Sequence, residues 1–191
     1  LFLCAISAAG IPGVTHYLAC GGGLDRPFLG NAAEDIAARQ TADFPALSSE
    51  SARAISDTIL RAKENRDSVG GITQTAVCGL PAGVGEPWFD TVESIISHAV
   101  FSVGGVKGIE FGSGFSAAGQ HGSSFNDPLR MEGERVVTAT NHNGGINGGI
   151  TNGMPVVFQC VVKPTPSIGQ IQQTVDFLRG ENAQIGVQGR H

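Results

Sequence analysis

The sequence is poor in charge and lacks the motifs of several catalytic classes. Only 15% of its 191 residues are charged, and the net charge is −5, whereas soluble domains carry roughly 25% charged residues. Generic nucleic-acid binding requires a basic face, so this acidic balance argues against a nucleic-acid partner. The four cysteines form no C-x-x-C pair and no H-E-x-x-H occurs, so we predict free thiols and no metal site. No apolar run reaches the roughly 20 residues that a membrane helix needs, which predicts no membrane span.

Glycine, by contrast, is abundant, with 28 residues, and the densest run leads into an apolar strand. Neither G-x-x-x-x-G-K-[ST] nor G-x-G-x-x-G between a strand and a helix is present, which argues against P-loop and Rossmann nucleotide enzymes. Residues 144–153 instead precede Pro155–Phe158, so this loop does not place a helix N-terminus on a phosphate. The alternative is a wide hairpin with many turns.

The apolar strand ends in a lysine, and turn residues that include two hydroxyl groups come directly after it. These are Lys163 and then Pro164, Thr165, Pro166 and Ser167. Glycine lets a backbone approach a ligand closely, and lysine with hydroxyl donors can bind a phosphate. The combination predicts a site for a planar or phosphorylated ligand. The alternative for Lys163 is a solvated strand end.

The pattern along the chain predicts one α+β domain over residues 1–191, with antiparallel strands packed against helices. Strands are expected at Leu1–Ala8, Ile72–Leu80, Val106–Phe111, Arg135–Thr140, Pro155–Lys163 and Ala183–Val187, and helices from Ser48 or Ser49 to near Asn65 and from Phe89 to Val103. Residues 10–30 and 114–133 are expected to form turns and a long irregular loop. Because the chain begins on an apolar segment without methionine, we expect it to lack its natural start.

Several strings, taken in order, resemble those of the chorismate synthase family. They are Asp67–Gly71, Gly79–Pro87, Val106–Gly112, Gly122-Ser123, Asn126-Asp127, Asn141–Gly153, Lys163–Ser167 and Gly189–His191. The resemblance extends from Asp67 to His191, whereas residues 1–66 match the family only loosely. It implies a β-α-β sandwich of the chorismate synthase type, in a cytoplasmic enzyme that is usually a homotetramer.

The resemblance also implies a reaction. Chorismate synthase is a lyase of the shikimate pathway, which leads to the aromatic amino acids, and it converts 5-enolpyruvylshikimate-3-phosphate to chorismate by anti 1,4-elimination of phosphate. The reaction needs reduced FMN without net redox change, and NADP is also associated with the family. The flavin supplies the difficult chemistry, and the protein supplies placement and charge.

The matched positions imply cofactor-binding residues. Gly104 and Gly105 match the flavin-contacting turn, where the family often has Asn-Ala, and Gly148 matches a glycine that lies against the flavin. Lys163 to Ser167 match the segment that wraps the flavin and its phosphate tail, and Arg190 matches an arginine near flavin and substrate. The alternative for Gly104 and Gly105 is that they end a helix and have no contact with a cofactor. Arg190 could be a disordered terminus, and His142 could make only a loop hydrogen bond.

Other strings of the family are absent from this sequence. They are a Glu-Ser-His-Gly string, an Arg-Pro-Gly-His-type string, a Ser-Ser-Ala-Arg-Glu flavin segment and the Asp-Pro-Cys that follows Gly-Arg-His. No catalytic residue is therefore assigned, and we expect a partial domain that does not turn over substrate alone. The alternative function is a non-catalytic scaffold or an anion- or flavin-binding module. The central expectation is that the loop near Gly148 and the cation of Lys163 jointly hold one flavin.

Overall fold

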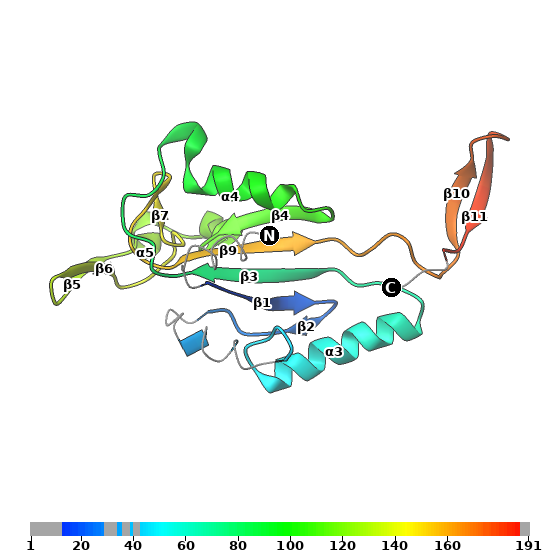
Figure 1. Ribbon diagram of the computed structural model, residues 1–191, viewed down its shortest axis with the longest axis horizontal. Helices are drawn as coiled ribbons and strands as arrows, with labels where there is room; N and C mark the ends of the chain where they lie inside the picture. The colour runs from blue at the N-terminus through cyan, green and yellow to red at the C-terminus, as the bar shows by residue number, and fades with distance from the viewer. Residues whose placement is uncertain (1–12, 29–33, 36–38, 40–42, 188–191) are drawn as a thin grey trace.

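A computed structural model describes residues 13–28, 34–35, 39 and 43–187 of the chain. Its centre is a five-stranded antiparallel sheet with the order β2-β1-β3-β9-β4 (Figure 1). The strands are β1 (Gly13–Cys20), β2 (Gly23–Leu24), β3 (Gly71–Val77), β4 (Val106–Phe111) and β9 (Val156–Val162). The expected antiparallel α+β class is confirmed, and the strand expected at Leu1–Ala8 lies outside the described residues.

Helix α3 (Ser49–Glu64) runs beside β1 and β2, and helix α4 (Val92–Phe101) runs beside β4. Ser48 caps α3 by accepting a hydrogen bond from the amide of Ser51 at 3.0 Å, which confirms the predicted start. The helix predicted from Phe89 to Val103 was too long at its start, because Phe89 lies in a short 3₁₀ turn (η1, Trp88–Asp90) and is 87% exposed. Helix α4 ends at Phe101, three residues before Gly104, the first of the glycine pair that was expected to stop it.

The main core lies between α4 and one face of the sheet. Val92 and Ile96 of α4 pack with Val77, Val156, Phe158 and Cys160. Side chains two residues apart share one face of a strand, and the register places Val77 opposite Val156. Burial raises the pKa of the Cys160 thiol to about 11, so this cysteine is a packing residue rather than a nucleophile.

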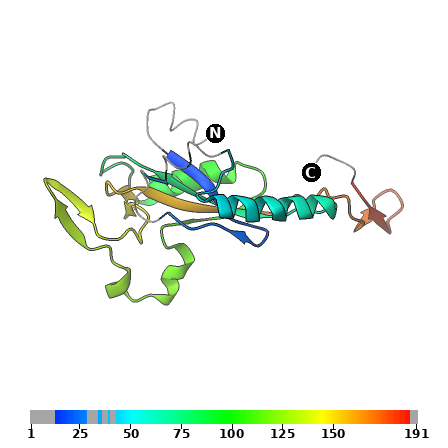
Figure 2. The same ribbon diagram turned by 90° about the horizontal axis from the view of Figure 1, so that it is seen from below.

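Three small hairpins and two short helical segments extend from the sheet. They are β5 (Leu129–Glu132) with β6 (Arg135–Thr138), β7 (Ile146–Asn147) with β8 (Ile150–Thr151), β10 (Gln172–Asp176) with β11 (Glu181–Ile185), and the segments η2 (Gly114–Gly119) and α5 (Gly122–Phe125). The irregular loop expected over 114–133 therefore contains η2, α5 and β5. The β5–β6 and β10–β11 hairpins project from opposite ends of the molecule (Figures 1 and 2).

Residues 10–30 were expected to form turns, and the described part of that range contains β1 and β2 instead. The glycines that suggested turns are concentrated at residues 21–23, where the chain reverses between the two strands. Among the described residues, no helix is both long and apolar enough to cross a bilayer.

Candidate functional site

The end of β9 brings Lys163 next to the turn that precedes β4. The Lys163 amide donates to the Gly105 carbonyl at 2.9 Å, and Val106 pairs with Val162. Gly104 is the exposed residue before this contact, and a Cβ placed on it would meet nothing within 4 Å. The structure therefore brings together the predicted residues Gly104, Gly105 and Lys163.

Residues Lys163 to Ser167 are all exposed, and they run past the turn that follows α3. The Ser68 hydroxyl donates to the Thr165 carbonyl at 2.7 Å. Farther along, the Gly169 amide donates to the Arg66 carbonyl at 3.0 Å. These bonds link the predicted segment to residues about 100 positions earlier in the sequence and so fix its path.

Gly70 permits the closest approach between this turn and the end of β9. A Cβ at Gly70 would lie 2.8 Å from the Val162 carbonyl oxygen and 2.9 Å from the Pro164 side chain. No side chain fits in that space, so glycine is required there. The contact explains why the glycine pair Gly70-Gly71 accompanies the lysine segment in this fold.

A cavity of about 400 Å³ opens at this end of the sheet. Two lysines line it, Lys63 in the last turn of α3 and Lys163 at the end of β9. The hydroxyl-bearing residues Ser68 and Thr165 also line it, and Tyr17 contributes an aromatic wall. The Ser68 hydroxyl already donates to the Thr165 carbonyl, so the two lysines and the Thr165 hydroxyl make the donor set, which suits a phosphate or carboxylate.

Asp67 is the one carboxylate among the lining residues, and one of its two oxygens already accepts a hydrogen bond. Its Oδ1 accepts from the Ser68 amide at 2.8 Å. Sequence reasoning missed Lys63, because a lysine in the last helical turn is explained by the helix dipole alone. It missed Tyr17 because residues 10–30 were expected to be turns rather than strand.

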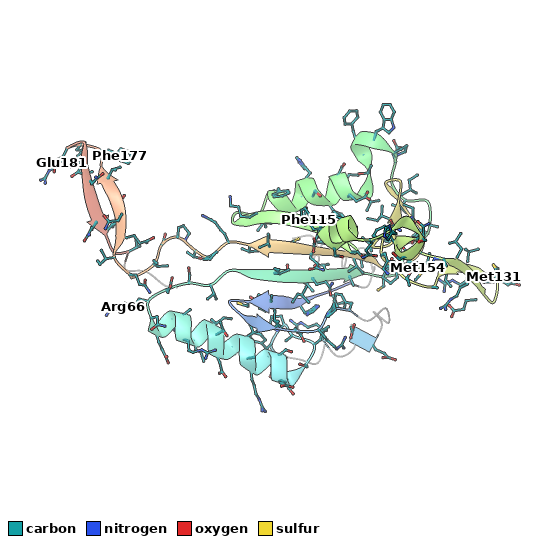
Figure 3. The ribbon with its side chains drawn as sticks, turned by 180° about the vertical axis from the view of Figure 1, so that it is seen from behind. Arg66, Phe115, Met131, Met154, Phe177 and Glu181 are labelled. Carbon is teal, nitrogen blue, oxygen red and sulfur yellow. The ribbon has the colours of Figure 1, made fainter. Side chains whose placement is uncertain are left out.

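The glycine loop lies at the other end of β9. Gly148 is in the turn between β7 and β8, and the neighbouring Gly149 carbonyl accepts from the Val92 amide at the start of α4 at 2.9 Å. The seven-residue strand β9 separates this loop from Lys163 by about 20 Å. In Figure 3, Met154 near the loop and Arg66 near the lysine segment mark opposite ends of the sheet.

The expectation that Gly148 and Lys163 jointly hold one flavin is therefore wrong within a single chain. The matched strings gave the order of these residues but not the end of the sheet at which each lies. Arg190, the remaining predicted cofactor residue, lies outside the described residues. Its role stays a prediction.

The glycine loop is held by a carboxylate, Asp127, whose side chain is 3% exposed. The carboxylate accepts from the Thr140 hydroxyl at 2.6 Å, from the amides of His142 and Asn143 at 2.7 and 2.9 Å, and from the Asn143 side chain at 2.8 Å. Burial acts to raise the pKa of Asp127, but these hydrogen bonds outweigh it and leave the pKa below its ordinary value.

The His142 ring confirms the expected loop hydrogen bond. Its Nδ1 lies 2.8 Å from the Phe125 carbonyl oxygen. Among the described residues, no group of three or more histidine, cysteine, aspartate or glutamate side chains is arranged to hold a metal ion.

Comparison with known proteins gives consistent matches. The family model described as chorismate synthase matches residues 5–191. Among curated proteins, the chorismate synthase of Methanosarcina acetivorans is 46% identical over 142 residues, which are 74% of this chain and 39% of that protein. The chorismate synthase of Chitinophaga pinensis is 53% identical over 126 residues, 66% of this chain and 37% of that protein.

A solved structure described as a crystal structure of chorismate synthase has a TM-score of 0.75 and 28% identity. The match covers 85% of this chain and 52% of the solved chain. The present chain thus spans about two fifths of the length of the curated relatives it matches. At this identity and TM-score, the likeness extends to the arrangement of the sheet and helices.

Proposed function

This chain belongs to the chorismate synthase family, and on that premise we propose that it forms the flavin-side part of an enzyme that eliminates phosphate from 5-enolpyruvylshikimate-3-phosphate to give chorismate. The observation that carries the proposal is the cavity with Lys63 and Lys163 beside Gly105. Both ligands of the reaction carry a phosphate, and the substrate also has two carboxylates. Clustered ammonium groups suit such ligands.

The residues present at this end fit reduced FMN. Lys163 and Lys63 would hold its phosphate tail, with the hydroxyl of Thr165 as a further donor. The exposed backbone of Gly104 leaves room for a flat ring system beside the lysine segment. When bound, FMN supplies the transient electron donation that helps expel phosphate, and the residues of this chain bind and orient it.

Binding of oxidised FMN to the purified chain tests the proposal directly. We expect saturable binding, measured by the change in flavin fluorescence. Lys163→Ala should lose about tenfold or more in FMN affinity, because a charged hydrogen bond is removed. Arg53→Ala is the matched control, since Arg53 is an exposed cation on α3 that does not line the cavity. Equal FMN affinity in the native chain and Lys163→Ala would contradict the placement of the phosphate tail.

Turnover is a separate measurement. Phosphate and chorismate are followed with reduced FMN under anaerobic conditions, at micromolar protein. We propose that the isolated chain binds FMN without turnover, because it spans about two fifths of its relatives and lacks the histidine-containing strings of the family. Clear chorismate production by this chain would defeat that expectation, and absence of any FMN binding would favour a non-catalytic scaffold.

We further propose that the enzyme is a cytoplasmic homotetramer and that NADP serves only in supplying reduced flavin. The exposed apolar side chains support assembly. Trp88 and Phe89 are 82% and 87% exposed, and Phe177 and Leu178 at the tip of the β10–β11 hairpin are 91% and 98% exposed. Exposed apolar groups of this size are typical of surfaces that another chain covers. Light scattering of the enzyme would measure the assembly.

A further inference from the structure

A second cavity, of about 920 Å³, lies at the opposite end of the molecule from Lys163. Its floor is formed by side chains of the sheet face opposite α4, including Gln74, Val157 and Gln159. Its walls come from the β5–β6 hairpin and residues 138–142. Figure 3 shows Met131 on that hairpin and Met154 beside the glycine loop at this end. The two cavities share no lining residue, so the second is independent of the proposed flavin site.

One wall of this cavity carries a buried acceptor without a partner. The Asn141 Oδ1 is buried and receives no hydrogen bond from any described residue. The Asn141 Nδ2 donates to the Pro155 carbonyl at 2.9 Å, which sets the orientation of the amide. Because a buried acceptor without a partner is unfavourable, this oxygen indicates a ligand with an N–H or O–H donor.

The hairpin adds a cation and an anion. Arg130 and Glu132 both line the cavity from β5, where residues two apart share one face. Within the described part of the chain, neither side chain makes an ion pair. A ligand with charges of both signs would therefore match this face of the hairpin.

His142 contributes one open ring nitrogen. A carbonyl oxygen only accepts hydrogen bonds, so the His142 Nδ1 carries the proton toward Phe125. In the tautomer with its proton on Nδ1, the Nε2 atom is an acceptor. Apolar side chains complete the lining, namely Phe28, Met154 and Val157. The cavity thus combines acceptors, a cation, an anion and an apolar wall.

We propose that this cavity binds an α-amino acid with an apolar side chain. The ammonium group donates to the Asn141 Oδ1 and pairs with Glu132, the carboxylate pairs with Arg130, and the side chain packs on Phe28 and Val157. A dicarboxylate would be repelled by Glu132 and would offer Asn141 no donor. A diamine would be repelled by Arg130. The zwitterion satisfies Asn141, Arg130 and Glu132 together.

Calorimetric titration of the purified chain with L-phenylalanine tests the proposal. We expect saturable one-to-one binding that Arg130→Gln and Glu132→Gln each weaken about tenfold, the effect of losing one charged contact. Arg135→Gln is the matched control, because Arg135 is exposed on the same hairpin and does not line the cavity. It should leave the affinity within about twofold, since Arg135 does not line the cavity.

Two analogues of L-phenylalanine test which charged group of the ligand each of the two hairpin residues contacts. Phenethylamine lacks the carboxylate, so Arg130→Gln should not weaken its binding further. 3-Phenylpropionate lacks the ammonium group, so Glu132→Gln should not weaken it. No binding of L-phenylalanine, or equal affinity in the native chain and both variants, would overturn the proposal. FMN affinity is measured in parallel and is expected to be unchanged in these variants, so a failure here is distinct from a failure of the flavin site.

Discussion

At the residue scale, Asp127 is the group on which the glycine loop depends most. Replacing it with asparagine keeps the shape but removes the charge and part of the accepting capacity that serve Thr140, His142 and Asn143. We expect Asp127→Asn to lower the free energy of unfolding by about 1–3 kcal/mol at pH 7. Urea denaturation measures the loss. Asp57→Asn, at an exposed position of α3, is the control and should change stability by less than about 0.5 kcal/mol.

The same carboxylate gives a pH dependence. The native pKa of Asp127 lies below its ordinary value, so its ionised form stabilises the fold. This contribution is full above the unfolded pKa of about 3.9 and is lost as the pH falls through the lower native value. The stability difference between native and Asp127→Asn chains should therefore shrink below about pH 4. A difference that stays constant down to pH 2 would show that the charge is not what the loop uses.

A second residue-scale prediction separates steric clash from backbone strain. Gly112 and Gly133 have φ angles of 56° and 62°. A Cβ at Gly112 would lie 2.1 Å from the His142 carbonyl oxygen, whereas one at Gly133 would meet nothing within 4 Å. We expect Gly133→Ala to cost about 1–2 kcal/mol through φ alone and Gly112→Ala to cost more than about 3 kcal/mol. Equal losses in thermal unfolding would contradict the close approach.

At the scale of elements, the helix with sequence signals at both ends was the one predicted best. Helix α3 has a serine cap and an apolar residue, Ile55, that is 0% exposed. We expect Ser48→Ala to destabilise the chain by about 1 kcal/mol, because the Ser51 amide loses its acceptor. Ser56→Ala inside the helix is the control and should be neutral or slightly stabilising. Chemical denaturation of both variants measures the difference.

Strand β4 was also predicted with its correct ends, Val106–Phe111, because the Gly104-Gly105 pair precedes it and Gly112 follows it. Strands β1 and β2 were missed, since their reversal at residues 21–23 gives the surrounding sequence a turn-like composition. Phe89 has the spacing of a core residue but is exposed. Spacing shows which residues share a face, and only packing decides whether anything covers that face.

The candidate site shows the same limit. The resemblance assigned both Gly105 and Lys163 to flavin contact, and the structure joins their backbones by a hydrogen bond. The separation of Gly148 from Lys163 was already implied by the strand expected at Pro155–Lys163, because an extended strand holds its two ends apart. Lys63 joins the site only because α3 ends beside the same strands. Sequence order therefore identified the ligand-binding residue types, and the sheet topology decided which of them meet.

At the scale of the whole molecule, the β10–β11 hairpin is a two-stranded unit that projects from the body (Figures 1 and 3). Phe177 and Leu178 at its tip are 91% and 98% exposed. An isolated two-stranded hairpin is marginally stable in water. We therefore expect this hairpin to be fully ordered only when another surface covers it, and the proposed assembly would supply that surface.

Hydrogen exchange followed by mass spectrometry tests this account. At the lowest protein concentration, we expect the amides of β10 and β11 to exchange far faster than those of β9, which is bonded on both sides by β3 and β4. Protection of the hairpin should increase with concentration as chains associate, while protection of β9 stays constant. Phe177→Ser with Leu178→Ser should abolish that increase without changing β9. Hairpin amides as protected as those of β9 in the dilute chain would mean that the hairpin is stable without a partner.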